Sequence, residues 1–248
     1  MNTLIDLLDE AVSRFPDTVA LEGDIEGLGR VRLTRTDLRD RAAFLAHQLI
    51  HSGMEPGDKV ALLSPNRPEW AVGYFGILLA GGVIVPLDVN LKEAELENIV
   101  RRSASVALVT DESERGRAAG FAPRRHETKM LYPLDAHGEV KAASTDECPG
   151  VKCGPEDLAL ISFSSGTTGT PKGVMLSHGN IASNVEASLK SLSCGPEDVF
   201  LSILPLSHMF ESTGGLLCPL LSGARVHYLL SLNPRLIAGA MQKEGITV

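Results

Sequence analysis

The feature that most constrains the fold is a repeated alternation of short apolar runs with segments of helical spacing. Between positions 59 and 110 three apolar runs rich in β-branched residues occur, at Lys59–Leu63, Val83–Leu87 and Val106–Thr110. Runs that are hydrophobic almost throughout are typical of parallel strands covered on both faces. Because helical patterns separate them, we predict an α/β fold of mainly parallel sheets flanked by helices.

The alternation resumes after a polar connection. Residues 135–156 have little periodicity and contain Pro149-Gly150 and Gly154-Pro155, which indicates a link between two α/β subdomains, 1–134 and 157–248. The chain stops at "EGITV", which has the pattern of another strand with no helix after it. We therefore expect the chain to be the N-terminal part of a longer protein.

One stretch has the length and the lack of charge of a membrane-spanning helix. Trp70–Leu87 carries no charge over 18 residues, the lower edge of the length that crosses a bilayer. However, Gly81-Gly82 divides it and a β-branched run follows, so a buried helix and a buried strand explain it better. The first residues lack the basic region of a signal peptide, and the spacing of Thr3 and Asp6 predicts a capped amphipathic helix instead.

Composition excludes some functions. The net charge of -8 and the pI near 5.4 argue against a nucleic-acid interface, which needs a concentrated basic face. Four cysteines are too few for a disulfide scaffold, and no second pair completes a zinc site with Cys148 and Cys153. Reduced cysteines favour a cytoplasmic protein. The cysteines are Cys148, Cys153, Cys194 and Cys218.

Several other conspicuous residues have simpler explanations. His47 and His51 lie four apart on a predicted helix, but no third ligand is placed, so a solvated helical face is favoured over a metal pair. His178 follows the N-cap candidate Ser177, which favours a turn residue. The aromatic side chains expected in the core are Trp70 and Phe75.

The run from Ile161 to Gly173, "ISFSSGTTGTPKG", raises the question of a bound ligand. Between positions 162 and 173 it holds six Ser or Thr residues, three glycines and one lysine. Glycines let backbone N–H groups turn inward around an anion, and a lysine adds a point charge for phosphate. The P-loop pattern fails at Pro171, and the glycine spacing fails the dinucleotide fingerprint. Composition alone leaves a flexible surface loop and a phosphate-binding loop both open.

The order of residues is more specific than their composition. "FSSGTTGTPKG" (Phe163–Gly173) resembles the phosphate-binding signature of the adenylate-forming superfamily, which includes acyl-CoA synthetases and peptide-synthetase adenylation domains. Gly57–Asp88 resembles an upstream core motif of that family. "LPLSHMFE" (Leu204–Glu211) resembles the segment that borders the acyl pocket of fatty-acid–CoA ligases. The chain is therefore similar to the N-terminal part of the large domain of bacterial medium- or long-chain fatty-acid–CoA ligases.

This resemblance implies a ligase that uses ATP, Mg²⁺ and CoA to convert a carboxylic acid into acyl-AMP and then a thioester. His208 would border the acyl substrate and orient its carboxylate; the alternative is a histidine packed at a turn. Gly169 would permit the turn of the loop, and magnesium ligands are not assigned. The family's adenine- and ribose-binding residues and its catalytic lysine would lie beyond Val248. The residues implied to contact the β- and γ-phosphates are Ser164, Ser165, Gly166, Thr167, Thr168 and Lys172.

Three functions stay open at this point. The first is a fatty-acid–CoA ligase, whose partners are a small carboxylic acid, ATP and CoA. The second is an aryl-acid–CoA ligase, or a fatty-acyl-AMP ligase that loads a carrier protein. The third is a non-catalytic fragment that binds nucleotide. None involves nucleic acid, and peripheral contact with a membrane is compatible with an enzyme that meets poorly soluble acids.

Overall fold

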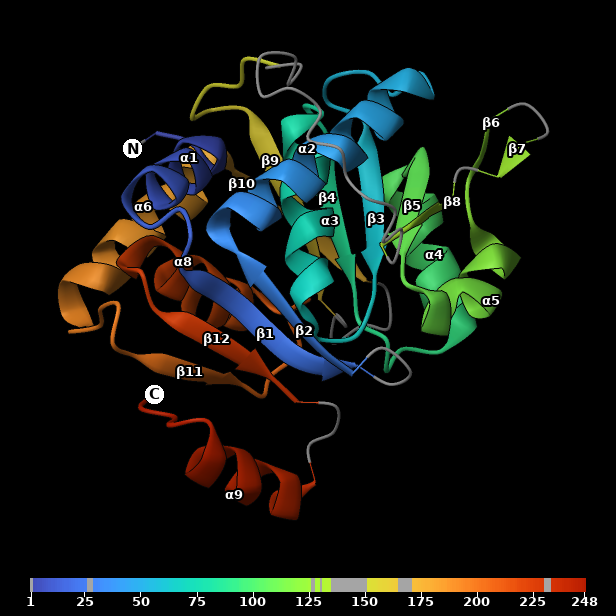
Figure 1. The fold of residues 1–248 in the computed structure, drawn as a ribbon. Helices are drawn as coiled ribbons and strands as arrows, with labels where there is room; N and C mark the ends of the chain where they lie inside the picture. Colours follow the sequence, from blue (N-terminus) through green and yellow to red (C-terminus); the bar gives the residue numbers. More distant parts are fainter. Residues whose placement is uncertain are drawn as a thin grey trace.

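The computed structural model describes residues 2–25, 29–125, 128–129, 131–134, 151–164, 171–229 and 233–248. Its main architecture is two β-sheets flanked by helices, which confirms the predicted α/β class (Figure 1). The larger sheet has the strand order β10-β9-β4-β3-β5-β8 and the smaller has the order β11-β12-β1-β2. A short ribbon of β6 (Arg124–Arg125) and β7 (Thr128–Lys129) stands apart.

The six-stranded sheet is parallel except at one edge. Its strands pair in parallel from β9 through β4 and β3 to β5 and β8, whereas β10 is antiparallel to β9. The carboxyl ends of five strands therefore share one edge of the sheet. The strands are β3 (Lys59–Leu63), β4 (Val83–Leu87), β5 (Ala107–Thr110), β8 (Leu131–Pro133), β9 (Leu158–Ser164) and β10 (Lys172–Ser177).

The four-stranded sheet joins the two ends of the chain. The predicted hairpin forms between β1 (Val19–Ile25) and β2 (Gly29–Thr34), and β1 also pairs in parallel with β12 (Arg225–Tyr228). β11 (Val199–Ser202) pairs with β12, and Val248 accepts a hydrogen bond from the backbone of Leu201. Each sheet thus contains strands from before and from after residues 135–156. The two sheets therefore do not correspond to the two expected subdomains. The boundaries of those subdomains stay a prediction.

Helix α3 (Pro68–Leu79) explains the uncharged stretch. All twelve of its residues are buried, because it contacts β3 and β4 of one sheet and β1 and β2 of the other. Figure 1 shows α3 beside α2 (Arg35–His51) in the middle of the molecule. A helix enclosed in this way has no solvent face and needs no polar stripe. In the part of the chain that the structure describes, no helix is long and apolar enough to cross a membrane.

The remaining helices cover the outer faces. α4 and α5 pack on the face of the larger sheet opposite α3, around Leu96 and Phe121, whereas α1, α6 and α8 pack together beside the smaller sheet. Thr3 and Asp6 form the predicted capping box of α1. The bounds are α1 Leu4–Arg14, α4 Glu93–Ser103, α5 Glu112–Phe121, α6 His178–Ser191, α7 Met209–Glu211, a π-helix Ser212–Leu217, α8 Cys218–Ser222 and α9 Pro234–Lys243.

His178 has a larger structural role than a turn residue. It is the first residue of α6 and is buried, and its Nδ1 accepts a hydrogen bond from the backbone N–H of Leu4 at 3.3 Å. Burial lowers the pKa of His178, although Asp157 and Asp6 act in the opposite direction. A proton on Nδ1 would also break the bond that joins α6 to α1. The folded state therefore holds this imidazole neutral.

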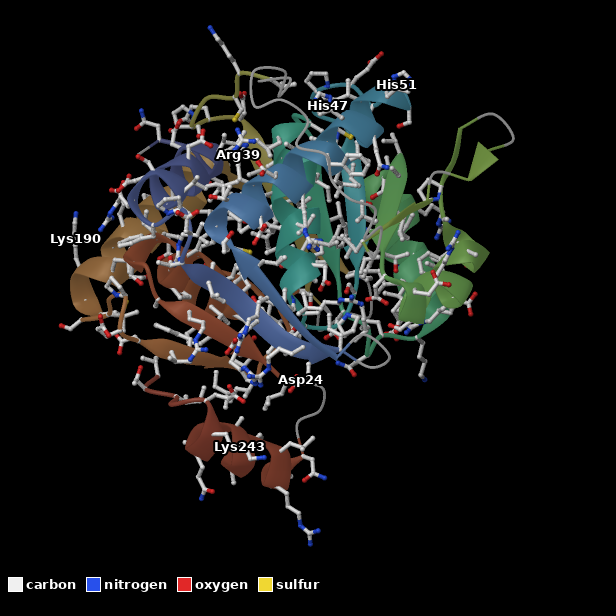
Figure 2. All side chains as sticks on the ribbon, viewed as in Figure 1. Asp24, Arg39, His47, His51, Lys190 and Lys243 are labelled. Atoms are coloured by element: carbon white, nitrogen blue, oxygen red, sulfur yellow. The ribbon has the colours of Figure 1, made fainter. Side chains whose placement is uncertain are left out.

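We expect the free energy of unfolding to fall as the pH drops below the ordinary histidine pKa of about 6.5. In that range the unfolded chain binds a proton at His178 that the folded chain does not, so stability rises with pH and is lost on acidification. Urea midpoints at pH 7.5 and 5.5 measure this slope. His178→Asn should flatten it, whereas the same change at the exposed His51 (Figure 2) should not. Equal slopes in all three proteins would contradict a neutral, buried His178.

Candidate functional site

The predicted phosphate-binding loop is anchored by two strands whose ends face each other. Ser164 ends β9, Lys172 begins β10, and these two residues are register partners in the antiparallel pair. Both side chains are exposed at the edge of the larger sheet where its parallel strands end. The other proposed contact residues of the loop lie outside the described residues; they are Ser165, Gly166, Thr167, Thr168 and Gly169.

Gly173 closes the base of this loop. A Cβ atom at Gly173 would lie 2.9 Å from the Cγ2 atom of Ile161 and 3.3 Å from the ring of Phe163. Real Cβ atoms do not come so close to a neighbouring carbon, so the packing at this point requires glycine. The last glycine of the motif therefore lets β10 lie against β9 immediately beside the two anchoring residues.

His208 lies at the same edge of the sheet. The β4–β9 register pairs Ile84 with Leu160, and continuing both strands by four residues places Asp88 level with Ser164. The Oδ2 atom of Asp88 is 3.7 Å from Nε2 of His208. The structure thus brings the base of the loop and the histidine of the "LPLSHMFE" segment to one edge, although they are far apart in the sequence.

The segment that carries His208 is held from one side by Asn66, which follows β3. The Nδ2 atom of Asn66 donates hydrogen bonds to the Leu204 carbonyl at 2.6 Å and to Ser202 Oγ at 3.1 Å. Its Oδ1 atom accepts a bond from the backbone N–H of Leu206 at 2.8 Å. One amide side chain from the larger sheet therefore fixes the backbone that leaves β11 in the smaller sheet.

Glu211 holds the same segment from the other side. This buried carboxylate accepts a hydrogen bond from Ser202 Oγ at 2.6 Å and another from the backbone of Leu204. Burial raises the pKa of Glu211, and the two hydrogen bonds act against that rise. A Cβ atom at Gly215 would lie 2.5 Å from Oε1 of Glu211, so the π-helix leaves room for the carboxylate only because that residue is glycine.

Glu211→Ala is expected to lower the free energy of unfolding by about 2 kcal/mol, because Ser202 Oγ and the Leu204 N–H lose their acceptor in a buried place. Glu211→Gln keeps an acceptor oxygen and should cost less than half of that. Urea denaturation of both variants measures the difference. Equal losses in the two variants would show that the negative charge, rather than the hydrogen-bond acceptor, stabilises this segment.

A second buried polar cluster stiffens the edge where β3 and β5 end. Ser64 Oγ donates a hydrogen bond to Asp111 Oδ2 at 2.5 Å, and Asp111 caps the start of α5. Arg67 Nε lies 3.0 Å from Glu69 Oε2, and Arg67 Nη1 lies 3.9 Å from Asp111 Oδ2. These groups are shielded from water and pair with one another, so they stabilise the turn that carries Asn66.

Sequence reasoning found the loop and His208 but missed Asn66, Asp88 and Glu211. All three lie inside the quoted family-like segments; Asn66 and Asp88 follow predicted strands, whereas Glu211 lies in the short helix α7. For Asn66 and Asp88 the signal was a polar residue shortly after an apolar parallel strand, because such residues gather at one edge of the sheet. Their partners could not be assigned, since those lie on strands distant in sequence.

One group of side chains has the residue types of a metal site, but neighbouring arginines offset its negative charge. Within the described residues, ligand atoms of Glu22, His227 and Glu244 lie within 4.8 Å of one another. Arg225 Nη1 is 2.7 Å from Glu22, and Arg30 Nη2 is 2.6 Å from Glu244. Arginines already neutralise both carboxylates, so this cluster does not favour a cation.

The same cluster shows how paired charges act on a buried acid. Burial alone would raise the pKa of Glu22, but the hydrogen bonds from His227 and Arg32 and the charge of Arg225 outweigh it and hold the pKa at about 2. Glu22 is therefore ionised at neutral pH and joins β1 to β12 and β2. Its role is structural.

The other residues singled out in the sequence lie in the core, on the surface of α2 or as free cysteines. Trp70 and Phe75 are core residues, as predicted. His51 is exposed and His47 is half-buried on α2 (Figure 2). The thiols of Cys153, Cys194 and Cys218 are free, whereas Cys148 lies outside the described residues.

Comparison with known proteins gives consistent matches. A family model described as AMP-binding enzyme matches residues 8–248. A feruloyl-CoA synthase of Amycolatopsis sp is 33% identical over 222 residues, which cover 89% of this chain and 43% of that protein. A long-chain-fatty-acid–CoA ligase of Bacillus subtilis (strain 168) is 30% identical over 249 residues, covering 85% of this chain and 43% of that protein.

A solved structure shares the fold. The fatty acyl-adenylate ligase of L. pneumophila, in complex with acyl adenylate and pyrophosphate, superposes with a TM-score of 0.85 at 23% identity. The match covers 100% of this chain and 44% of that chain. The present chain therefore spans less than half the length of these three proteins.

Proposed function

The chain belongs to the AMP-binding enzyme family, and on this premise we propose that the whole protein is an ATP-dependent acid–CoA ligase. It would activate a carboxylic acid as acyl-AMP with release of pyrophosphate and then transfer the acyl group to the thiol of CoA. The observation that carries this proposal is that the base of the loop, at Ser164 and Lys172, shares one edge of the larger sheet with His208.

The residues at this edge fit the charges of the first half-reaction. Lys172 and the donors of the loop would neutralise the β- and γ-phosphates that leave as pyrophosphate, which lowers the barrier electrostatically. His208 would orient the acid's carboxylate for attack on the α-phosphate. The loop residues in these roles are Ser164, Ser165, Gly166, Thr167 and Thr168, with Gly169 at the turn.

ATP would supply the adenylyl group, and Mg²⁺ would supply positive charge that offsets the negative charge of the phosphates. The donor set at the loop consists mainly of hydroxyl groups and one ammonium, which fits phosphate oxygens. Protein ligands of the metal are not assigned. The free thiols of Cys153, Cys194 and Cys218 fit a reducing compartment, so we place the protein in the cytoplasm.

A fatty acid is the favoured substrate class. Three apolar side chains are exposed next to His208 in the sequence: Ile203, Leu204 and Phe210, the last with 77% of its surface exposed. An apolar acyl chain could cover such residues with a gain of roughly 25 cal/mol per Å² buried. An aryl acid is the second candidate, because a feruloyl-CoA synthase is 33% identical to this chain.

The test is acid-dependent exchange of labelled pyrophosphate into ATP by the whole protein. We expect exchange with medium- or long-chain alkanoic acids and weaker exchange with cinnamic and benzoic acids. Adding CoA or an acyl carrier protein to the same reaction then identifies the thiol acceptor. Exchange with no acid of either class would overturn the proposal, and exchange with aryl acids alone would favour the second candidate.

A further inference from the structure

We propose that Asp88 is a positioning residue that orients the imidazole of His208 for the adenylation step. The proposal rests on the function proposed above, but its physical basis is the contact between the two side chains. Oδ2 of Asp88 lies 3.7 Å from Nε2 of His208, a separation of an ion pair rather than a hydrogen bond.

The Asp88 carboxylate is held in place by its own turn. Oδ1 accepts hydrogen bonds from the backbone N–H and from the Nδ2 atom of Asn90, both at 2.9 Å. The backbone of Leu91 also donates to the Asp88 carbonyl at 3.1 Å. With Oδ1 fixed by Asn90, the second oxygen has a defined direction, and that oxygen is the one near His208.

His208 has a fixed backbone and a freely exposed ring. Its N–H donates to the Pro205 carbonyl at 2.9 Å, and its carbonyl accepts from Ser212 at 3.0 Å. The side chain, however, is 64% exposed. An exposed ring with no fixed neighbour would sample several rotamers. The fixed carboxylate of Asp88 favours the ring orientation in which Nε2 of His208 faces Asp88. In that orientation Nδ1 faces away from Asp88.

Stability does not account for this arrangement. An ion pair that is exposed to this degree contributes about 0 to 1 kcal/mol to folding. Catalysis is more sensitive, because misplacing a substrate-orienting group by about 1 Å can cost roughly 100-fold in rate. A positioning role therefore predicts a functional loss without a matching loss of stability.

The first test uses pyrophosphate exchange by the whole protein. Asp88→Asn keeps the acceptor for Asn90 but removes the charge, and we expect kcat to fall about 10-fold with the KM for ATP unchanged. In a His208→Ala background the same substitution should have no further effect, since coupled residues are not additive. Additive losses, or a rise in KM for ATP alone, would overturn the proposal.

The second test does not depend on activity. In ¹H–¹⁵N spectra of the 248-residue chain, Asp88→Asn should shift the ring signals of His208, identified by their loss in His208→Gln. The matched control is Asp58→Asn, because Asp58 also accepts a backbone N–H in a turn but precedes β3 at the opposite edge. Unmoved His208 signals would overturn the contact itself. Moved signals with no exchange for any acid would leave the contact standing and refute the proposed function.

Discussion

Lys172→Ala is expected to lower kcat/KM for ATP in pyrophosphate exchange by about 100-fold in the whole protein. Lys172 is exposed opposite Ser164 at the base of the loop. The KM for the acid should change little, because in the proposed role the lysine would act on the leaving pyrophosphate and not on the acid. Lys172→Arg should recover part of the rate.

The matched control for this substitution is Lys190→Ala. Lys190 is exposed near the end of α6 and points into solvent (Figure 2). We expect its exchange rate to stay close to that of the unsubstituted protein. Both variants should keep their thermal midpoints, since neither side chain is buried. Equal rates for the two variants would refute the role of Lys172.

Arg35→Ala is expected to lower the free energy of unfolding by about 3 kcal/mol, because it leaves several buried carbonyl groups without donors. Arg35 is fully buried in α2, and it donates to the carbonyls of Leu220 at 2.9 Å and Ala224 at 2.8 Å. It also donates to Thr18 Oγ1 at 2.7 Å and lies 5.4 Å from the ring of Phe15. Burial lowers the pKa of Arg35 to about 10, so it stays charged at neutral pH.

The expected loss corresponds to a fall of about 9 °C in Tm for a chain of this length. Arg35→Lys should be intermediate, because an ammonium group cannot reach all the carbonyls that the planar guanidinium reaches. Arg39→Ala is the control on the same helix: Arg39 pairs at the surface with Asp9 at 2.9 Å, and its loss should cost less than about 1 kcal/mol. Calorimetry distinguishes these outcomes. A Tm shift no larger than that of Arg39→Ala would contradict the role of Arg35.

Much of the fold was predictable because it depends on neighbours in the chain. The capping box of Thr3 and Asp6, the buried helix that starts at Pro68 and the strand at Val83–Leu87 all follow from spacing within a few residues. The loop motif and His208 were also identified from residue order alone. These features need no knowledge of what packs against them.

The joining of the two sheets was not predictable in the same way. β1 pairs with β12, and β4 pairs with β9, across long separations in sequence. The hydrophobic pattern of a segment indicates that it forms a buried strand, but it does not indicate which strand pairs with it. The same limit hid the pairing of Asn66 with Leu204 and the burial of Arg35 against α8.

The sequence by itself determined the class of elements, their order and the residue order of the loop motif on which the proposed phosphate site rests, because local spacing and residue identity carry that information. Only the tertiary structure decided that the base of the loop shares one edge with Asp88 and His208, since parallel pairing aligns strand ends that are distant in the chain. It also decided that Glu211 and Asn66 hold the histidine segment from both sides, because buried polar groups must find partners wherever the packed core brings them.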